Sequence, residues 1–240
     1  MFAIETKNLT KKFKERIAVN EIDLKINQGE LFALLGTNGA GKTTTIKMLS
    51  TLILPTDGEI KINGLDIIKD RQKIKEILNV SPQETAIAPN LSVKENLEFM
   101  AGVYQISNKQ EKINELIKMF KLDEILNQKA KTLSGGWQRK VSIAISLINE
   151  PKILFLDEPT LGLDVIARKE LWAVIENLKG KITIILTTHY MEEAESLSDR
   201  IGIMAKGKLI DIGTSKELIE KTGAKNFEDA FVKIATGGEL

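Results

Sequence analysis

The chain contains no cysteine among its 240 residues. That absence excludes disulfide bonds and thiolate-ligated metal sites, and it fits a reducing compartment. Long apolar runs are also missing, because the longest ones, such as "LFALL" and "ILFL", are far too short to span a bilayer. The N-terminal stretch "MFAIETKNLTKKF" has no apolar segment of the kind found in signal peptides. We therefore expect a cytoplasmic chain that reaches a membrane, if it does so, through a partner protein.

An excess of charge of one sign is missing as well. The chain has 34 basic and 33 acidic residues and a net charge of +1, so it has no basic footprint and we expect no nucleic-acid partner. What is present is an ordinary globular balance of 42% apolar and 28% charged residues, which is enough for a sizeable core. A chain of this length forms one large domain or two small ones.

The first part of the chain carries the patterns of strands and one helix. Residues Ala3–Ile26 alternate loosely and include β-branched residues, which predicts strands. The run "LFALLG" (Leu31–Gly36) is continuously apolar and ends in glycine, as buried strands of parallel sheets do. "GEIKING" (Gly58–Gly64) predicts an exposed strand between turns. Between them, apolar residues at helical spacing predict the buried face of a helix: Ile46, Leu49 and Ile53.

The middle of the chain changes character. From Leu91 to about Asn149 the apolar residues keep helical spacing and no strand pattern is found. The alternation of strand and helix patterns then returns with "ILFLD", a helical stretch over 167–178, "ITIIL" and "IGIM". Residues Ser215–Ala235 predict one or two short helices. The simplest architecture is an α/β fold in which a parallel core sheet is interrupted by a helical insertion.

The stretch "GTNGAGKTT" (Gly36–Thr44) matches G-x-x-x-x-G-K-[ST] and lies between a predicted strand and a predicted helix. Its glycines allow the backbone to bend so that successive N–H groups point at phosphate, and the helix dipole adds to the attraction. Lys42 can reach the β- and γ-phosphates, and Thr43 can place its hydroxyl on Mg²⁺. We therefore predict a nucleotide phosphate site made of Gly36, Thr37, Asn38, Gly39, Ala40, Gly41, Lys42, Thr43 and Thr44.

Two carboxylates follow the predicted strand in "ILFLDEP" (Ile153–Pro159). In open α/β sheets, ligands bind at the carboxyl ends of the strands. Taken alone, such a pair is more often a solvated strand end, but beside a phosphate loop it favours a nucleotide site. Asp157 would then hold Mg²⁺ and Glu158 would polarise the attacking water.

A second phosphate-binding pattern lies about a hundred residues after the first. In "LSGGWQRK" (Leu133–Lys140), a serine and two glycines open a predicted helix, whose free N–H groups suit an anion. With this third motif the chain closely resembles the nucleotide-binding subunit of ATP-binding-cassette (ABC) transporters over residues 3–215. "GTNGAGKTT" resembles the family's Walker A motif, "ILFLDEP" its Walker B motif, and "LSGG" its signature.

Smaller motifs fall in the family's order too. "LGLD" (Leu161–Asp164) resembles the D-loop, although the family more often has serine where Leu161 stands. Gln83 stands at the place of the Q-loop glutamine, and Phe13 at that of the aromatic residue that stacks on adenine. His189, the one histidine of the chain, follows the strand pattern "ITIILTT", where the family has its switch histidine.

The resemblance implies a P-loop NTPase (RecA-like) core with an antiparallel β-subdomain and an inserted α-helical subdomain. It implies a single ABC ATPase domain over 1–240, with the core and β-subdomain in 1–83 and 150–214, the helical subdomain in 84–149 and a C-terminal helical tail in 215–240. It also implies ATP and Mg²⁺ as ligands, a second ATPase protomer, identical or paralogous, and an integral membrane permease subunit. "PTLGLDVIARKEL" and "NFEDAFVKIATG" look most like the ATPases of ABC-2-type exporters, a group that serves drug, sodium, lipid and polysaccharide export.

The family's roles carry over residue by residue. Glu158 would be the general base, Lys42 would bind the phosphates and His189 would sense the γ-phosphate. The metal site would be Thr43, Gln83 and Asp157. Leu133, Ser134, Gly135 and Gly136 would complete the ATP site of the opposite protomer, and Asp164 would pass information between the two sites.

Two other readings of the motifs stay open. The first is a soluble ABC ATPase without a transport role, of the cluster-assembly type. Translation-type members carry two cassettes in one chain and repair-type members carry long heptad repeats, and this sequence has neither. The second is a nucleotide-binding scaffold without catalysis. Such degenerate cassettes usually lose the glutamate, the histidine or the signature, and this chain keeps all three.

Overall fold

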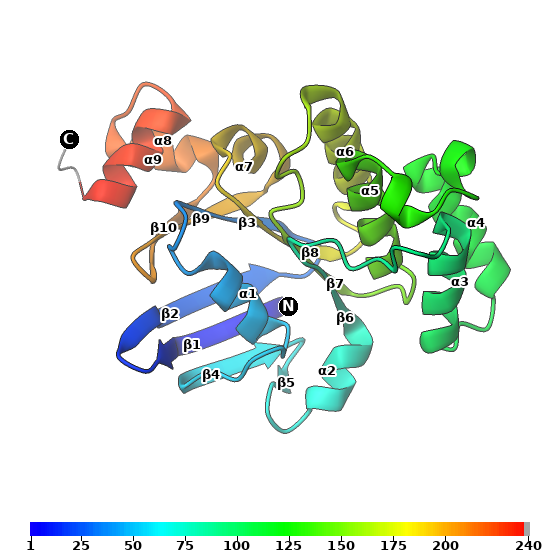
Figure 1. Cartoon of the computed structure of the whole chain (residues 1–240). Helices are drawn as coiled ribbons and strands as arrows, with labels where there is room; N and C mark the ends of the chain where they lie inside the picture. Colours follow the sequence, from blue (N-terminus) through cyan, green and yellow to red (C-terminus); the bar gives the residue numbers. More distant parts are fainter. Residues whose placement is uncertain (238–240) are drawn as a thin grey trace.

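A parallel sheet forms the centre of the computed structural model, which describes residues 1–237 (Figure 1). The strand order is β10-β9-β3-β8-β7-β6, and every pairing is parallel except the β9–β10 hairpin. The strands are β3 (Leu31–Gly36), β6 (Leu78–Ser81), β7 (Ile153–Asp157), β8 (Thr183–Thr188), β9 (Arg200–Ala205) and β10 (Lys208–Gly213).

Strands β3, β7 and β8 are buried along their whole length, as their continuous apolar runs predict. Successive residues point to opposite faces, so Leu154 and Leu156 join one hydrophobic cluster and Phe155 joins another. Because these strands are parallel, the residues that follow their carboxyl ends gather at one edge of the sheet. The phosphate loop, the Asp157–Glu158 pair and His189 all lie at that edge.

A second, antiparallel sheet has the order β2-β1-β4-β5. Its strands are β1 (Phe2–Phe13), β2 (Arg16–Asn27), β4 (Asp57–Ile62) and β5 (Leu65–Asp66). It packs with α1 (Lys42–Leu49) and α2 (Arg71–Ile77) on the Phe155 face of the parallel sheet. The β1–β2 hairpin pairs Phe13 with Arg16, and this brings both side chains to the mouth of the phosphate loop.

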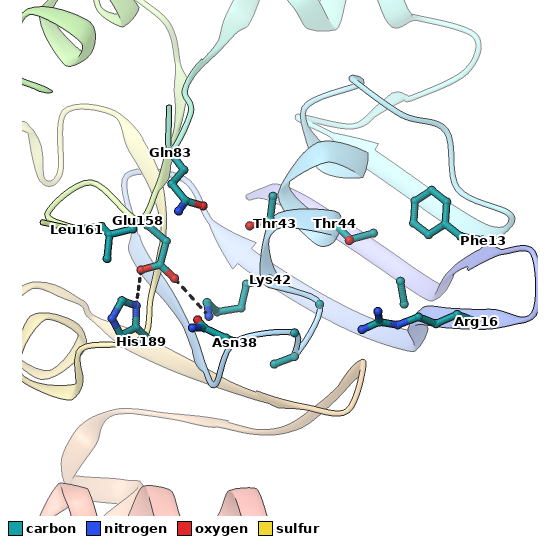
Figure 2. Close-up of a pocket in the computed structure, with 14 residues that line it drawn as sticks. Phe13, Arg16, Asn38, Lys42, Thr43, Thr44, Gln83, Glu158, Leu161 and His189 are labelled. Atoms are coloured by element: carbon teal, nitrogen blue, oxygen red, sulfur yellow. Dashed lines mark hydrogen bonds and ion pairs between the residues drawn. The ribbon is translucent and has the colours of Figure 1, made fainter. Parts of the chain in front are cut away.

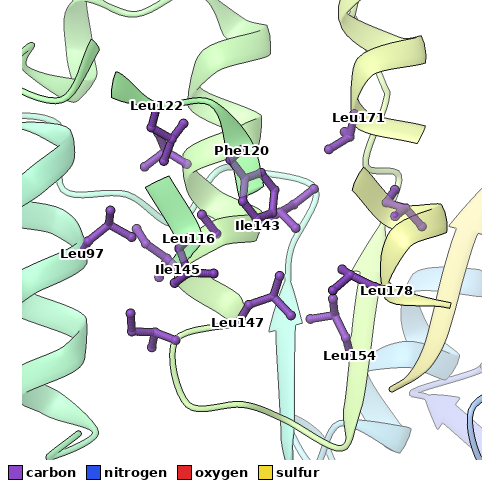
Figure 3. Close-up of a cluster of buried hydrophobic side chains, with 14 of the residues drawn as sticks. Leu97, Leu116, Phe120, Leu122, Ile143, Ile145, Leu147, Leu154, Leu171 and Leu178 are labelled. Atoms are coloured by element: carbon purple, nitrogen blue, oxygen red, sulfur yellow. The ribbon is translucent and has the colours of Figure 1, made fainter. Parts of the chain in front are cut away.

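The helical insertion packs on the opposite face. It contains α3 (Val93–Val103), α4 (Lys109–Phe120), the short 3-10 turns η1 (Asp123–Ile125) and η2 (Ala130–Thr132), and α5 (Gly135–Ser146). A capping box between Ser92 and Glu95 fixes the start of α3. Figure 3 shows how side chains such as Leu97, Phe120, Ile143 and Leu154 pack into one cluster that joins the insertion to the sheet.

The remaining helices follow the later strands. They are α6 (Val165–Leu178), α7 (Met191–Leu197), α8 (Ser215–Thr222) and α9 (Phe227–Thr236), of which α8 and α9 form the red end of Figure 1. Helix α9 contacts β9, and its Phe227 and Phe231 join a hydrophobic cluster with residues of β3, β9, α7 and α8. The last three residues of the predicted tail, 238–240, lie outside the described residues. Within residues 1–237, no helix is long and apolar enough to cross a membrane.

Several sequence-based expectations were wrong in detail. The first helix ends at Leu49, so Ile53 lies beyond it, packed against the cluster under the antiparallel sheet. The strand predicted as exposed over Gly58–Gly64 is half-buried, because Ile60 and Ile62 face that same cluster. Helix α2 and strand β6 were missed. β6 reads "LNVS" and lacks an apolar run, and it forms because its backbone pairs with β7.

Candidate active site

A cavity of about 630 Å³ opens at the carboxyl edge of the parallel sheet. Figure 2 shows its walls: the phosphate loop and α1 in the middle, Glu158, His189 and Gln83 on one side, and Phe13 with Arg16 on the other. The sequence-predicted residues that line it are Phe13, Asn38, Gly39, Ala40, Gly41, Lys42, Thr43, Thr44, Gln83, Glu158 and His189.

The phosphate loop needs its glycines because other backbone segments pass close by. A Cβ atom on Gly36 would lie 2.4 Å from the Met204 carbonyl oxygen. One on Gly41 would lie 2.6 Å from the Ala18 carbonyl oxygen, and Gly41 also has a φ of +105°. Gly41 is the N-cap of α1 and makes no side-chain cap, so the first N–H groups of the helix face the cavity. This is the geometry of an anion site.

Lys42 is 5% exposed and its ammonium group lies among oxygen atoms. Its Nζ lies 2.7 Å from the Gly36 carbonyl oxygen, 3.3 Å from that of Thr37 and 3.3 Å from Glu158 Oε1. A buried ammonium group that is held by carbonyl groups and one carboxylate is fixed in position at the loop. It is therefore placed to meet a phosphate that enters the cavity.

Asp157 ends strand β7 and accepts two hydroxyl hydrogen bonds on Oδ1. Thr187 donates at 2.5 Å and Thr43 donates at 3.2 Å. Within the described residues, no group of three or more His, Cys, Asp or Glu side chains could hold a metal ion. The hydroxyl and carboxylate pair nevertheless fits Mg²⁺, which is usually held by one or two carboxylates together with substrate phosphates.

Glu158 is buried and joins Lys42 to the only histidine of the chain. Its Oε2 lies 2.7 Å from His189 Nδ1, while its Oε1 faces Lys42 (Figure 2). The backbone at Glu158 has a φ of +50°, a left-handed conformation that costs free energy in a residue with a side chain. Its N–H donates to the Thr187 backbone oxygen and hydroxyl, both at 3.1 Å, and these bonds hold the strained turn in place.

Gln83 follows strand β6, and its loop is fixed from the side of α5. The buried Arg139 guanidinium donates to the Pro82 carbonyl at 2.6 Å and also to the Gln83 carbonyl. Burial lowers the pKa of Arg139, and the negative charge of Asp157 opposes that shift. Helix α5, whose N-cap is Ser134, thus holds the backbone of the loop that carries Gln83 into the cavity.

Three lining residues were not predicted from the sequence: Arg16, Ala18 and Leu161. The Arg16 guanidinium lies beside Gly39, since a Cβ built on Gly39 would be 3.8 Å from its Nη2. Arg16 could have been predicted from the short hairpin turn between Phe13 and Arg16, which places the two side chains near each other. Arg16 adds a positive charge to a cavity that already suits phosphate.

The signature residues lie outside this cavity. Ser134, Gly136 and Asp164 line a separate hollow of about 280 Å³ together with Trp137, whose ring lies 4.4 Å from Lys140 Nζ. Leu133 is buried in the helical cluster. Asp164 caps α6 by accepting hydrogen bonds from the N–H groups of Ile166 and Ala167, a structural role that its motif did not predict.

Gly135 and Gly136 differ in their surroundings. A Cβ on Gly136 would lie 3.2 Å from Ala167 Cβ, whereas one on Gly135 would meet no atom within 4 Å. Packing within the described residues therefore explains why position 136 is glycine. It does not explain why position 135 is glycine. A glycine that faces open space at a helix start suits the close approach of a ligand or of another chain.

The family model for "ABC transporter" matches residues 19–161. The chain belongs to the ABC transporter family. It is 36% identical over 98% of its length to the linearmycin resistance ATP-binding protein LnrL of Bacillus subtilis, of which it covers 75%. It is 42% identical over 92% of its length to the phospholipid-transporting ATPase ABCA3 of Homo sapiens, and 41% identical over 90% to the probable multidrug ABC transporter ATP-binding protein YbhF of Escherichia coli.

The chain spans 13% of the length of ABCA3 and 38% of that of YbhF, so it corresponds to one part of each. Among solved structures, it resembles an ATP-binding subunit of an ABC transporter with a TM-score of 0.87 at 28% identity, covering 97% of this chain and 99% of the other. It also resembles a dimeric ATP-binding cassette in a post-hydrolysis state bound to ADP and Pi, with a TM-score of 0.79 at 28% identity over 88% of this chain and 98% of the other. These likenesses confirm the predicted family and P-loop fold class, and they support an ATPase.

Proposed function

We propose that this chain binds and hydrolyses ATP to power transport, in the direction of export, through a separate membrane-spanning subunit. One observation carries the catalytic part. Glu158 is held at the phosphate loop between Lys42 at 3.3 Å and His189 at 2.7 Å. A carboxylate so placed can orient a water molecule and accept its proton as the γ-phosphate is attacked.

The other lining residues bind and orient the nucleotide. Phe13 stacks on the adenine at the mouth of the cavity, and the loop amides with Lys42 bind the phosphates. Thr43, Gln83 and Asp157 would hold Mg²⁺, and the bound ion would supply positive charge that offsets the negative charge of the phosphates. His189 donates toward the γ-phosphate and keeps Glu158 oriented.

The working form is a dimer of two such chains, identical or paralogous. Support comes from the signature, which lies outside the chain's own cavity, and from Gly135, which faces open space. Ser134, Gly135 and Gly136 of each protomer complete the ATP site of the other. The dimeric cassette among the similar structures supports a dimer.

A peripheral position on the cytoplasmic face of a membrane follows from the permease partner. The names of the relatives, which refer to multidrug transport, phospholipid transport and linearmycin resistance, support export as the direction. The contact with the permease runs through the loop after Gln83 and the helical insertion. Their surface exposes Phe99 and Val103 of α3 and the next residue, Tyr104, whose large side chains suit a protein partner.

Two measurements test the proposal. The first compares wild type with Lys42→Ala by calorimetric ATP titration, with the exposed Lys47→Ala on the same helix as control. Loss of charge-assisted bonds should weaken ATP binding by roughly 10- to 100-fold in Lys42→Ala and leave the control unchanged. An unchanged affinity for ATP in Lys42→Ala would contradict the proposal that the phosphate loop binds ATP.

The second measurement addresses transport. The chain is co-expressed with any membrane protein of several apolar spans that a neighbouring gene encodes, purified in detergent and assayed for phosphate release. Co-elution of the two, with faster release than from the chain alone, supports the transport role. A chain that hydrolyses ATP at full rate alone and never co-elutes supports the soluble ATPase instead.

A further inference from the structure

Glu193 is a buried carboxyl group that has no part in the nucleotide cavity. It lies on α7, the helix that begins just after His189, and its exposure is 0%. Burial raises the pKa of Glu193, and the neighbouring polar groups of Thr188, Thr160 and Trp172 oppose that rise. A buried carboxyl group without a counter-charge is costly, so its retention needs an explanation.

The contacts of Glu193 join three segments of the chain. Its Oε1 accepts a hydrogen bond from the Thr160 hydroxyl at 2.8 Å and another from the Trp172 indole at 3.0 Å. Its Oε2 is enclosed and has no hydrogen-bond partner within residues 1–237. Glu193 Oε1 thus holds both Thr160, at the start of the Thr160–Asp164 loop, and Trp172 of α6.

Glu158 and His189 lie on the same two segments that Thr160 and Glu193 connect. Glu158 precedes Thr160 by two residues, and the Glu158–His189 contact is 2.7 Å long. Two side-chain contacts therefore join these segments. The outer contact is Glu158–His189 at the cavity, and the inner contact is Thr160–Glu193, which is buried. The position of the inner contact constrains the outer one, since each segment is short and its backbone is fixed by further bonds.

We propose that Glu193 is a positioning residue that holds the Thr160 segment against α7 and so keeps Glu158 and His189 in contact. This inference rests on the proposed function, in which that pair acts in ATP hydrolysis. Glu193 touches neither the nucleotide nor the water, and it acts through Thr160. The bond that matters is the one its Oε1 accepts, so the side chain works as a carbonyl acceptor and needs no negative charge.

The test uses three variants of the full chain that change the inner contact while keeping side-chain volume. Thr160→Val removes the donor, Glu193→Leu removes the acceptor, and Glu193→Gln keeps the acceptor without the acid. The readouts are kcat, KM for ATP and the Hε1 NMR resonance of His189, which is unambiguous because the chain has one histidine. Trp172→Phe serves as the matched control, since it removes the α6 bond and leaves the Thr160 bond.

We expect Thr160→Val and Glu193→Leu to lower kcat about tenfold, because each removes one hydrogen bond of a positioning network. The KM for ATP should stay within about twofold of wild type. In both, the His189 resonance shifts. Glu193→Gln and Trp172→Phe keep kcat within about twofold and keep the resonance in place. The Thr160→Val, Glu193→Leu double variant is no slower than either single variant, because both remove one interaction.

A folded Thr160→Val variant with wild-type kcat and an unmoved His189 resonance would overturn the proposal. So would a loss of kcat in Trp172→Phe equal to that in Thr160→Val, because general packing around Glu193 would then be responsible. If wild type itself releases no phosphate from ATP, the proposed function fails, whereas the His189 resonance still decides whether Glu193 positions that side chain.

Discussion

Arg139 holds Gln83 by its backbone, because the guanidinium donates to the Pro82 carbonyl at 2.6 Å and to the Gln83 carbonyl. Helix α5, which carries the signature at its start, is thereby tied to the loop that reaches the phosphate cavity. A guanidinium can donate to two carbonyls from one plane, whereas an ammonium group is a point charge on a flexible stem.

Arg139→Lys should therefore loosen Gln83 without touching the phosphate loop. We expect ATP affinity within about twofold of wild type and kcat lower by about tenfold, the effect of losing one charge-assisted bond. The control is Arg71→Lys on α2. Arg71 also donates to a backbone carbonyl, that of Thr51 at 2.7 Å, but it does not line the cavity. Equal losses of kcat in the two variants would mean that Arg139 acts through stability alone.

Glu158→Gln keeps the shape of the side chain and removes the proton acceptor. Turnover should fall by roughly 100-fold or more, the contribution of a positioned general base. ATP binding should survive, and an ATP-bound dimer should accumulate and be visible by size-exclusion chromatography with light scattering. Glu192→Gln is the control, since Glu192 lies on α7 nearby with only a 3.6 Å ion pair to Arg168. Near-normal turnover in Glu158→Gln would remove Glu158 from the role of base.

The buried acid of Glu193 also predicts a pH effect on stability. Burial raises the pKa of Glu193 above the ordinary glutamate value of 4.5, so the folded chain binds this proton more tightly than the unfolded chain does. Its contribution to stability is fully present below pH 4.5 and is lost as pH rises through the folded pKa. The nearby negative charge of Glu158 acts in the same direction as burial.

Glu193→Gln cannot ionise and should lack this dependence. Thermal unfolding of wild type and Glu193→Gln measures the difference in stability. The pH is varied from ~4 to ~9, a range that brackets an ordinary glutamate pKa. We expect the stability of the variant relative to wild type to be greater at high pH than at low pH. Parallel curves would show that Glu193 keeps an ordinary pKa in the folded chain.

Much of the site could be predicted from short, contiguous stretches of sequence. The phosphate loop depends on a strand, a glycine-rich turn and a helix that are contiguous, so the residues of Gly36–Thr44 could be predicted as a unit. Asp157, Glu158 and His189 each follow an apolar strand. The rule that parallel strands present their carboxyl ends at one edge predicts that they meet, and the 2.7 Å contact between Glu158 and His189 agrees with it.

The parts that could not be predicted depend on packing between distant segments. Arg139 and Glu193 read as ordinary polar residues of amphipathic helices, and only the fold shows that both are buried against loops of the site. Strand β6 lacks an apolar run because its identity comes from pairing with β7. Arg16 reaches Gly39 only because the hairpin folds back over the phosphate loop.

The two glycines of the signature allow a test of the dimer that does not depend on hydrolysis. Gly135 is the first residue of α5, and a Cβ there would meet no atom of its own chain within 4 Å. Alanine is the better helix former by about 0.5–1 kcal/mol, so Gly135→Ala should leave the monomer as stable as wild type or slightly more so. Thermal unfolding without nucleotide measures this.

The same methyl group should harm the assembled state. If the partner's ATP approaches Gly135 closely, as we propose, an added methyl group is an overpacked contact that costs roughly 1–3 kcal/mol. ATP-dependent dimerisation of a Glu158→Gln, Gly135→Ala protein should then weaken by about tenfold or more relative to Glu158→Gln alone, measured by sedimentation. Gly102→Ala in α3 is the matched control, because a Cβ there also meets nothing within 4 Å and yet lies away from the signature. Equal dimerisation in the two alanine variants would place the partner's nucleotide elsewhere.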